Sequence, residues 1–239
     1  MDSLMNNDSG STVADLHTKR YYRNHGGFLW VDRHGIDHRA DTLLTYLQKV
    51  DEMGFKTKHF YVNQITQDIE RLHRLELGEG NEDINHVMAR LEYRLTKSYL
   101  RYVGGQRFGF VNPSFVLNRL DSIAPNPYDS IKRPVRYRGL FDVKMQHASD
   151  AFFHLALQQL RSRVDVDGEE TEKSRLAAFL KDVQPKSPFY YTLQERLKSE
   201  SLDRNQRMKI LVIMERCRWR EADYPARQKN YVLVNIPCF

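Results

Sequence analysis

An apolar stripe between Asp83 and Val103 constrains the fold of this chain more than any other feature of its sequence. Apolar side chains recur there three or four residues apart, which is the spacing of one face of an α-helix. They are Ile84, Val87, Met88, Leu91, Leu95, Tyr99 and Tyr102. Gly104 and Gly105 follow directly, and glycine commonly terminates helices. The pattern predicts a long core helix that ends at this glycine pair.

Helical spacing and helix-start signals continue along most of the chain. They predict helices over residues 41–53, 60–77, 141–163 and 171–183. Ser187 followed by Pro188 is an N-cap with proline at the first helical position. Asp203 and Gln206 form a capping box that begins a last helix through Cys217. Prolines interrupt residues 121–139, which we expect to form a long loop or a hinge.

The C-terminal residues break the helical pattern. The run Tyr231-Val232-Leu233-Val234-Asn235-Ile236-Pro237 is rich in β-forming residues and predicts a strand. A lone strand leaves its backbone hydrogen bonds unpaired, and no comparable strand follows it in the sequence. The fold prediction is therefore an all-α, irregular multi-helix domain of about seven to nine helices, with one orphan C-terminal β-strand.

The same segment carries a family resemblance. Met214-Glu215-Arg216-x-x-Trp219, followed by Tyr-Val-x-Val-Asn-Ile-Pro at 231–237, closely resembles the junction between the helical scaffold domain and the catalytic domain of large bacterial L,D-transpeptidases. The resemblance covers most of residues 17–239. Its upstream elements are Phe28-Leu29-Trp30, Met53-Gly54-Phe55, Tyr99-Leu100-Arg101-Tyr102 and Asn112-Pro113.

The resemblance implies a division of the chain. Residues 1–14 would be a disordered leader, 15–223 a helical scaffold domain with its possible hinge at 121–139, and 224–239 a linker and the first strand of a catalytic domain. The rest of that domain would lie beyond residue 239. The residues expected at the domain junction are Met214, Arg216, Trp219, Tyr231, Asn235 and Pro237.

The catalytic motif of the resembling family is not found in this chain. Those enzymes transfer acyl groups through a cysteine thiolate within Ser-His-Gly-Cys-x-Arg, with a histidine managing the proton. Cys217 follows Glu215-Arg216 and Cys238 follows Ile236-Pro237, so neither lies in that context. We therefore predict no catalytic residue and no enzyme activity for this chain. Its two cysteines are compatible with one bridge or with two thiols, and a small core residue is the preferred role for Cys217.

Two short motifs suggest metal ligands but lack the full pattern. His34 and His38 stand four residues apart, yet Gly35 weakens a helix between them, so we expect a polar turn. Asp165-Val166-Asp167-Gly168 begins like a calcium loop, but its glycine comes too early and Ser174 replaces the required glutamate. We expect a solvated loop there and predict neither metal nor cofactor.

The chain is basic, with a net charge of +6 and a pI near 9.2. Clusters such as 132–138 interleave basic and aromatic residues, which favours nucleic-acid binding. However, 31 acidic residues are spread among 37 basic ones, as on an ordinary solvated surface. A basic surface would also attract the carboxylates of peptidoglycan, in line with the resemblance.

Location and function follow from these observations. Mean hydropathy is −0.65 and no apolar run suits a membrane span. The N-terminus lacks the pattern of a secretory signal, whereas the resemblance implies the cell envelope or periplasm. The predicted function is a non-catalytic scaffold region of a peptidoglycan-remodelling L,D-transpeptidase, with the parent's catalytic domain and peptidoglycan as partners. The alternative is a stand-alone basic binding module for a protein partner or nucleic acid.

Overall fold

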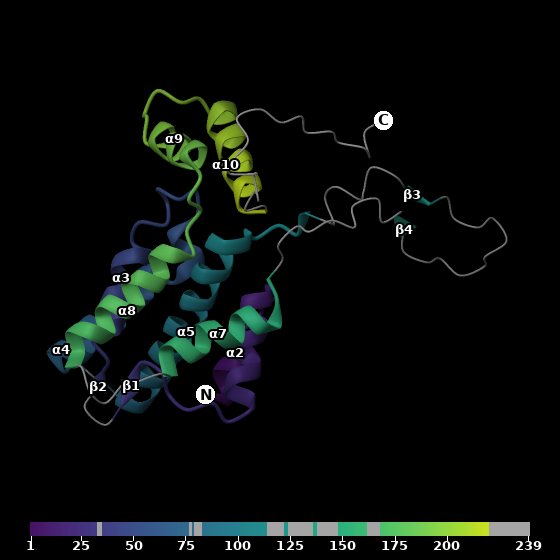
Figure 1. Ribbon diagram of the computed structural model, residues 1–239. Helices are drawn as coiled ribbons and strands as arrows, with labels where there is room; N and C mark the ends of the chain where they lie inside the picture. Colours follow the sequence, from purple (N-terminus) through teal and green to yellow (C-terminus); the bar gives the residue numbers. More distant parts are fainter. Residues whose placement is uncertain are drawn as a thin grey trace.

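The protein is helical throughout the part that the computed structural model describes, which comprises residues 1–32, 35–76, 78, 83–113, 122–123, 136–137, 148–161 and 168–219 (Figure 1). The all-α prediction is confirmed. The elements in chain order are α1 (Asp2–Asn7), α2 (Val13–Arg23), β1 (Val31–Asp32), β2 (Gly35–Ile36), α3 (Arg39–Leu47), the 3₁₀ helix η1 (Thr57–Phe60), α4 (Val62–Arg74), α5 (Ile84–Phe108), β3 (Ser122–Ile123), β4 (Arg136–Tyr137), α7 (Asp150–Arg161), α8 (Gly168–Asp182), α9 (Pro188–Leu197) and α10 (Arg204–Trp219).

Helix α5 is the centre of the domain, as its apolar stripe predicted. It contacts α2, α3, α4, α7, α10 and η1, and Figure 1 shows α2, α3 and α7 beside it. Leu91, Leu95 and Tyr99 are fully buried in the main core. The hydroxyl of Tyr99 donates to the carbonyl of Ala156 on α7 at 2.9 Å. A single apolar stripe therefore organises most of the fold.

The glycine pair does not end α5, and this corrects the sequence prediction. The helix continues through Gly104 and Gly105 to Phe108. A Cβ at Gly104 would lie 3.0 Å from the Phe153 ring, and one at Gly105 would lie 2.6 Å from the Phe110 ring. These glycines therefore allow close approach of aromatic side chains, and the break comes at Gly109, whose φ is +76°.

The N-terminal residues are folded, which corrects the prediction of a disordered leader over 1–14. Residues 2–7 form α1, and Met5 is buried beside Tyr22 and Tyr93. The carboxylate of Asp8 accepts from Lys97 at 2.5 Å and from the hydroxyl of Tyr93 at 2.8 Å. Because buried α5 residues supply these partners, the segment has tertiary contacts that its polar composition did not reveal.

A buried carboxylate fixes the segment between α2 and β1. Glu92 of α5 is fully buried, and its oxygens accept the backbone N–H groups of Leu29, Trp30 and Val31 at 2.8, 2.9 and 3.1 Å. The Tyr22 hydroxyl donates to the same carboxylate at 2.5 Å. Trp30, the aromatic residue of the Phe-Leu-Trp motif, is thereby held in the core.

The last two helices form a pair with a core of its own. That core consists of Tyr190, Leu193, Leu197, Ile210 and Met214. The predicted capping box is present, because Asp203 N–H donates to the side chain of Gln206 and Gln206 N–H donates to Asp203. Figure 1 shows α9 and α10 beyond one end of the main helical group. α10 also contacts α5, so the pair is attached to the main body.

Other predictions differ in detail or fall outside the described residues. α3 ends at Leu47 rather than 53, and turns lead on to Gly54. Gly35 and Ile36, which lie between His34 and His38, form β2 and pair antiparallel with β1, while His34 itself lies outside the described residues. The predicted strand 231–237, Cys238 and most of the predicted hinge lie outside the described residues. Among the described helices, none is long and apolar enough to cross a membrane.

Candidate functional site

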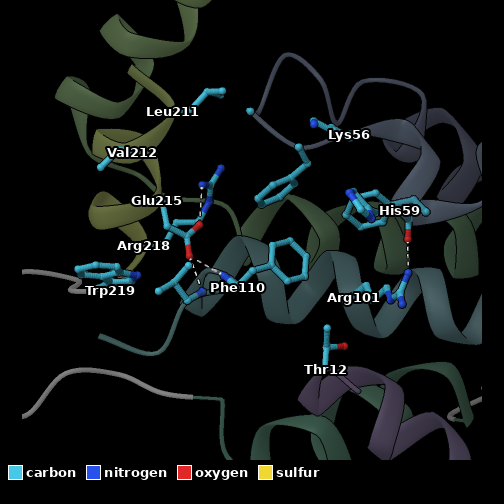
Figure 2. A pocket seen from close by; sticks show the side chains of 14 residues that line it. Thr12, Lys56, His59, Arg101, Phe110, Leu211, Val212, Glu215, Arg218 and Trp219 are labelled. Atoms are coloured by element: carbon cyan, nitrogen blue, oxygen red, sulfur yellow. Dashed lines mark hydrogen bonds and ion pairs between the residues drawn. The ribbon is translucent and has the colours of Figure 1, made fainter. Parts of the chain in front are cut away.

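A largely apolar pocket of about 620 Å³ lies where the end of α10 meets the main helical body. Its walls come from residues 54–56, η1, α10, and α5 with the turn that follows it. Figure 2 shows Phe110 near the middle, Glu215, Arg218 and Trp219 toward one end, and His59 and Arg101 toward the other. Trp219, one of the residues that the sequence assigned to the domain junction, lines this pocket.

Glu215 connects α10 to the turn that follows α5. One of its carboxylate oxygens accepts the backbone N–H groups of Phe110 and Val111 at 2.6 and 2.8 Å. The backbone at Gly109 permits this approach, since a Cβ there would clash with the carboxylate. These charge-assisted bonds fix one wall of the pocket against the other.

Arg218 is a buried cation that joins three segments. Its Nη2 donates to the carbonyl of Met53 at 2.5 Å and to the hydroxyl of Tyr190 at 2.7 Å. Its guanidinium lies 4.3 Å from the Phe55 ring centroid, in cation–π geometry. The other oxygen of Glu215 lies 3.5 Å from Arg218 Nη1. The final turn of α10 is therefore attached both to α9 and to the loop after α3.

The opposite end of the pocket carries positive charge. Arg101 donates to Asp15 at 2.7 Å and also to the carbonyl of His59. Partial burial, followed by the charges of Lys58, Arg101 and Lys56, lowers the pKa of His59. The charges of Lys58, Arg101 and Lys56 thus act near this end of the pocket, where Asp15 pairs with Arg101.

The junction residues proposed from sequence fall into two groups. Met214 is fully buried between α9 and α10, Trp219 is 7% exposed and lines the pocket, and Arg216 is exposed. Tyr231, Asn235 and Pro237 lie outside the described residues. The structure therefore places Trp219 beside the pocket, whereas Met214 stabilises the helix pair behind it.

Sequence reasoning missed several residues that build this site. Phe55, Phe110 and the Glu215–Arg218 pair are far apart in sequence, so no local spacing could bring them together. Arg218 was not identified from the sequence, although it is 3% exposed and central to the site. The position of Arg218, one residue before the tryptophan that ends α10, does not by itself indicate a role in the site. That role becomes visible only when the fold brings the Met53 carbonyl within hydrogen-bond distance.

Neither metal nor thiol chemistry is prominent in the described residues. Within them, no three His, Cys, Asp or Glu side chains gather as a metal site would require. Cys217 packs beside the α9–α10 core, and burial raises the pKa of its thiol. Such a thiol is neutral at pH 7.

Comparison with known families gives the class of the domain. A family model described as "Scaffold domain" matches residues 16–139, just over half of the chain. The chain therefore belongs to the scaffold-domain family. It matches no curated protein and no solved structure.

Proposed function

We propose that the chain is the non-catalytic scaffold region of a peptidoglycan-remodelling L,D-transpeptidase, and that it positions a catalytic module and its cell-wall substrate. Membership of the scaffold-domain family supports the scaffold role. The L,D-transpeptidase parent is supported by the Met214-to-Trp219 motif and the Tyr231-to-Pro237 motif.

The observation that carries the proposal is the anchoring of the last turn of α10. Arg218 bonds to Met53 and Tyr190, and Glu215 bonds to the backbone after α5. A scaffold must hold the point from which the next module departs in a fixed direction. These bonds give the chain a defined orientation at Trp219, which a mobile helix end would not supply.

The environment of Cys217 is consistent with acyl transfer taking place in a separate catalytic module. A cysteine nucleophile needs a lowered pKa or an adjacent base, whereas burial raises the pKa of the Cys217 thiol. Under the proposal, acyl transfer is carried out by a thiolate of the parent's catalytic module, and the present chain contributes no reacting group.

Peptidoglycan is the proposed polymer partner and the cell envelope or periplasm is the proposed location. The net charge of +6 favours attraction to the stem-peptide carboxylates. This attraction is long-ranged at low salt and is screened at high salt. It therefore predicts binding that depends on both carboxylates and ionic strength.

A pelleting experiment tests the substrate part of the proposal. The 239-residue protein is mixed with purified peptidoglycan sacculi, and with matched sacculi whose stem peptides have been removed by an amidase. We expect retention on intact sacculi that decreases with added salt, and much weaker retention on stripped sacculi. Equal retention on both, or none at low salt, would contradict the proposed substrate.

A protein-binding module is the second candidate. It is favoured by the outer side of α10, where Met208 and Val212 are 54% and 50% exposed, one turn apart. Nucleic-acid binding has the weaker support, because the basic residues are mixed with acidic ones. Retention on DNA-cellulose at physiological salt, with no retention on sacculi, would favour that alternative.

A further inference from the structure

The junction pocket contains hydrogen-bond donors without acceptors. Nε of Arg218 and Nε1 of Trp219 are both buried, and neither has a hydrogen-bond partner among the residues that the structure describes. Both residues line the pocket and are more than nine-tenths buried. Buried polar atoms without partners are rare because they have lost water and gained nothing in exchange. Arg218 and Trp219 therefore each present a donor to which a ligand could supply the acceptor.

The acidic group among the described pocket-lining residues already has partners of its own. The carboxylate of Glu215 is the acidic group among the pocket-lining residues, and it is engaged by Phe110, Val111 and Arg218. The remaining charged side chains of the lining are cationic, namely Lys56, Arg101 and Arg218. A ligand that brings acceptor oxygens and negative charge would complement this wall.

The rest of the pocket is suited to an apolar group. The rings of Phe55 and Phe110 meet edge to face with their centroids 5.0 Å apart. Phe110 remains 44% exposed, and Val212 across the pocket is 50% exposed. The volume of about 620 Å³ lies within the range of small-molecule sites, which are mostly apolar with a few directed polar groups.

We propose that this pocket binds a small amphipathic carboxylate. Its aromatic or aliphatic body lies against Phe55 and Phe110, and its carboxylate accepts hydrogen bonds from Arg218 Nε and Trp219 Nε1. Both nitrogens are shielded in the free protein, so the side chains beside them must shift for the carboxylate to reach them. The proposal does not depend on the scaffold function.

Three matched probes test the chemistry of the head group. 4-Phenylbutyrate, 4-phenylbutanol and 4-phenylbutylamine share one apolar body and differ in charge. Each is titrated into the full chain by calorimetry. We expect 4-phenylbutyrate to bind with a dissociation constant on the order of 1 mM or below, about tenfold tighter than the alcohol, and the amine to bind most weakly. Equal affinities for the three probes would overturn the proposal. So would the absence of 4-phenylbutyrate binding at about 10 mM, which is tenfold above the expected dissociation constant.

Variants locate the site. Trp219→Phe keeps the ring but removes one donor, and should weaken 4-phenylbutyrate binding about fivefold or more without changing the affinity for the alcohol. Val212→Trp fills the pocket and should abolish binding of both. Met208→Trp adds the same ring one turn away, outside the pocket lining, and serves as its control. Loss of binding in Met208→Trp, or unaltered binding in Val212→Trp, would place the site elsewhere.

A fourth probe separates a small acid from a polypeptide. Acetyl-Gly-Gly-Phe carries the same phenyl ring and carboxylate on a peptide. We expect it to bind more weakly than 4-phenylbutyrate, because its peptide groups add polar atoms to an apolar pocket. Tighter binding that is lost in Val212→Trp would assign the site to a polypeptide C-terminus and overturn the small-molecule assignment.

Discussion

Replacing Glu92 with glutamine should destabilise the fold by a predictable amount. The carboxylate accepts three consecutive backbone N–H groups, of Leu29, Trp30 and Val31, at 2.8–3.1 Å. An amide has one acceptor oxygen, and its nitrogen is a donor. In either orientation, at least one buried N–H group therefore loses its acceptor. An unsatisfied buried donor costs about 1–3 kcal/mol.

We expect Glu92→Gln to lower the free energy of unfolding by about 2 kcal/mol. For a domain of this size that corresponds to a fall of about 4–8 °C in the melting temperature. Urea unfolding at pH 7, followed by circular dichroism, measures the change. Glu70→Gln makes the same substitution at an exposed position of α4 and should have little effect. A Glu92→Gln variant as stable as Glu70→Gln would refute the reasoning.

The pH dependence supplies a second readout of the same group. Burial raises the pKa of Glu92 above its ordinary value of 4.5, outweighing the hydrogen bonds that favour its charged form. A carboxyl with a raised folded-state pKa contributes its stability below the unfolded pKa and loses it as pH rises through the folded value. The stability of the protein should therefore decrease as pH rises above 4.5 through the folded-state pKa of Glu92, and Glu92→Gln should lack this contribution.

Three further predictions concern other parts of the structure. Burial opposes ionisation of Asp8, but its bonds to Lys97 and neighbouring groups lower its pKa from 3.8 to about 2; melting curves should show stability lost as pH falls from 3.8 toward 2, and Asp8→Asn should lack this loss. Trp219→Ala should cost about 3–5 kcal/mol in urea unfolding, whereas an unchanged curve would contradict the buried position and favour a ligand-stacking role. Gly109→Ala should cost about 1–3 kcal/mol because its φ is +76° and its Cβ would press on Glu215; an unshifted urea midpoint would contradict that account.

The helical framework could be predicted from the sequence because its signals are local. The α5 stripe, the N-cap at Ser187 and the capping box at Asp203 each depend on residues within a few positions of one another. These signals located α5, α9 and α10. The end of α5 could not be predicted from local signals. Gly104 and Gly105 look like a helix stop in the sequence, but in the fold they make room for the rings of Phe153 and Phe110, and the helix continues.

Most of the candidate site could not be predicted, because its residues come together through contacts between distant parts of the chain. Trp219 was identified because it ends a helix beside a family motif. Arg218 was not, because its role comes from Met53, which is 165 positions away along the chain. The folded N-terminal segment has the same explanation, since Asp8 meets Lys97 from a distant part of the sequence. Polar residues that gain buried partners look like ordinary surface residues until the fold is known.

The most direct test of the scaffold proposal is to read the genomic DNA downstream of the codon for Phe239 in all three frames. The account predicts a region rich in β-strand patterns that contains Ser-His-Gly-Cys-x-Arg. A downstream sequence with no such motif and no remnant of one in any frame would contradict the L,D-transpeptidase assignment and favour a stand-alone binding protein.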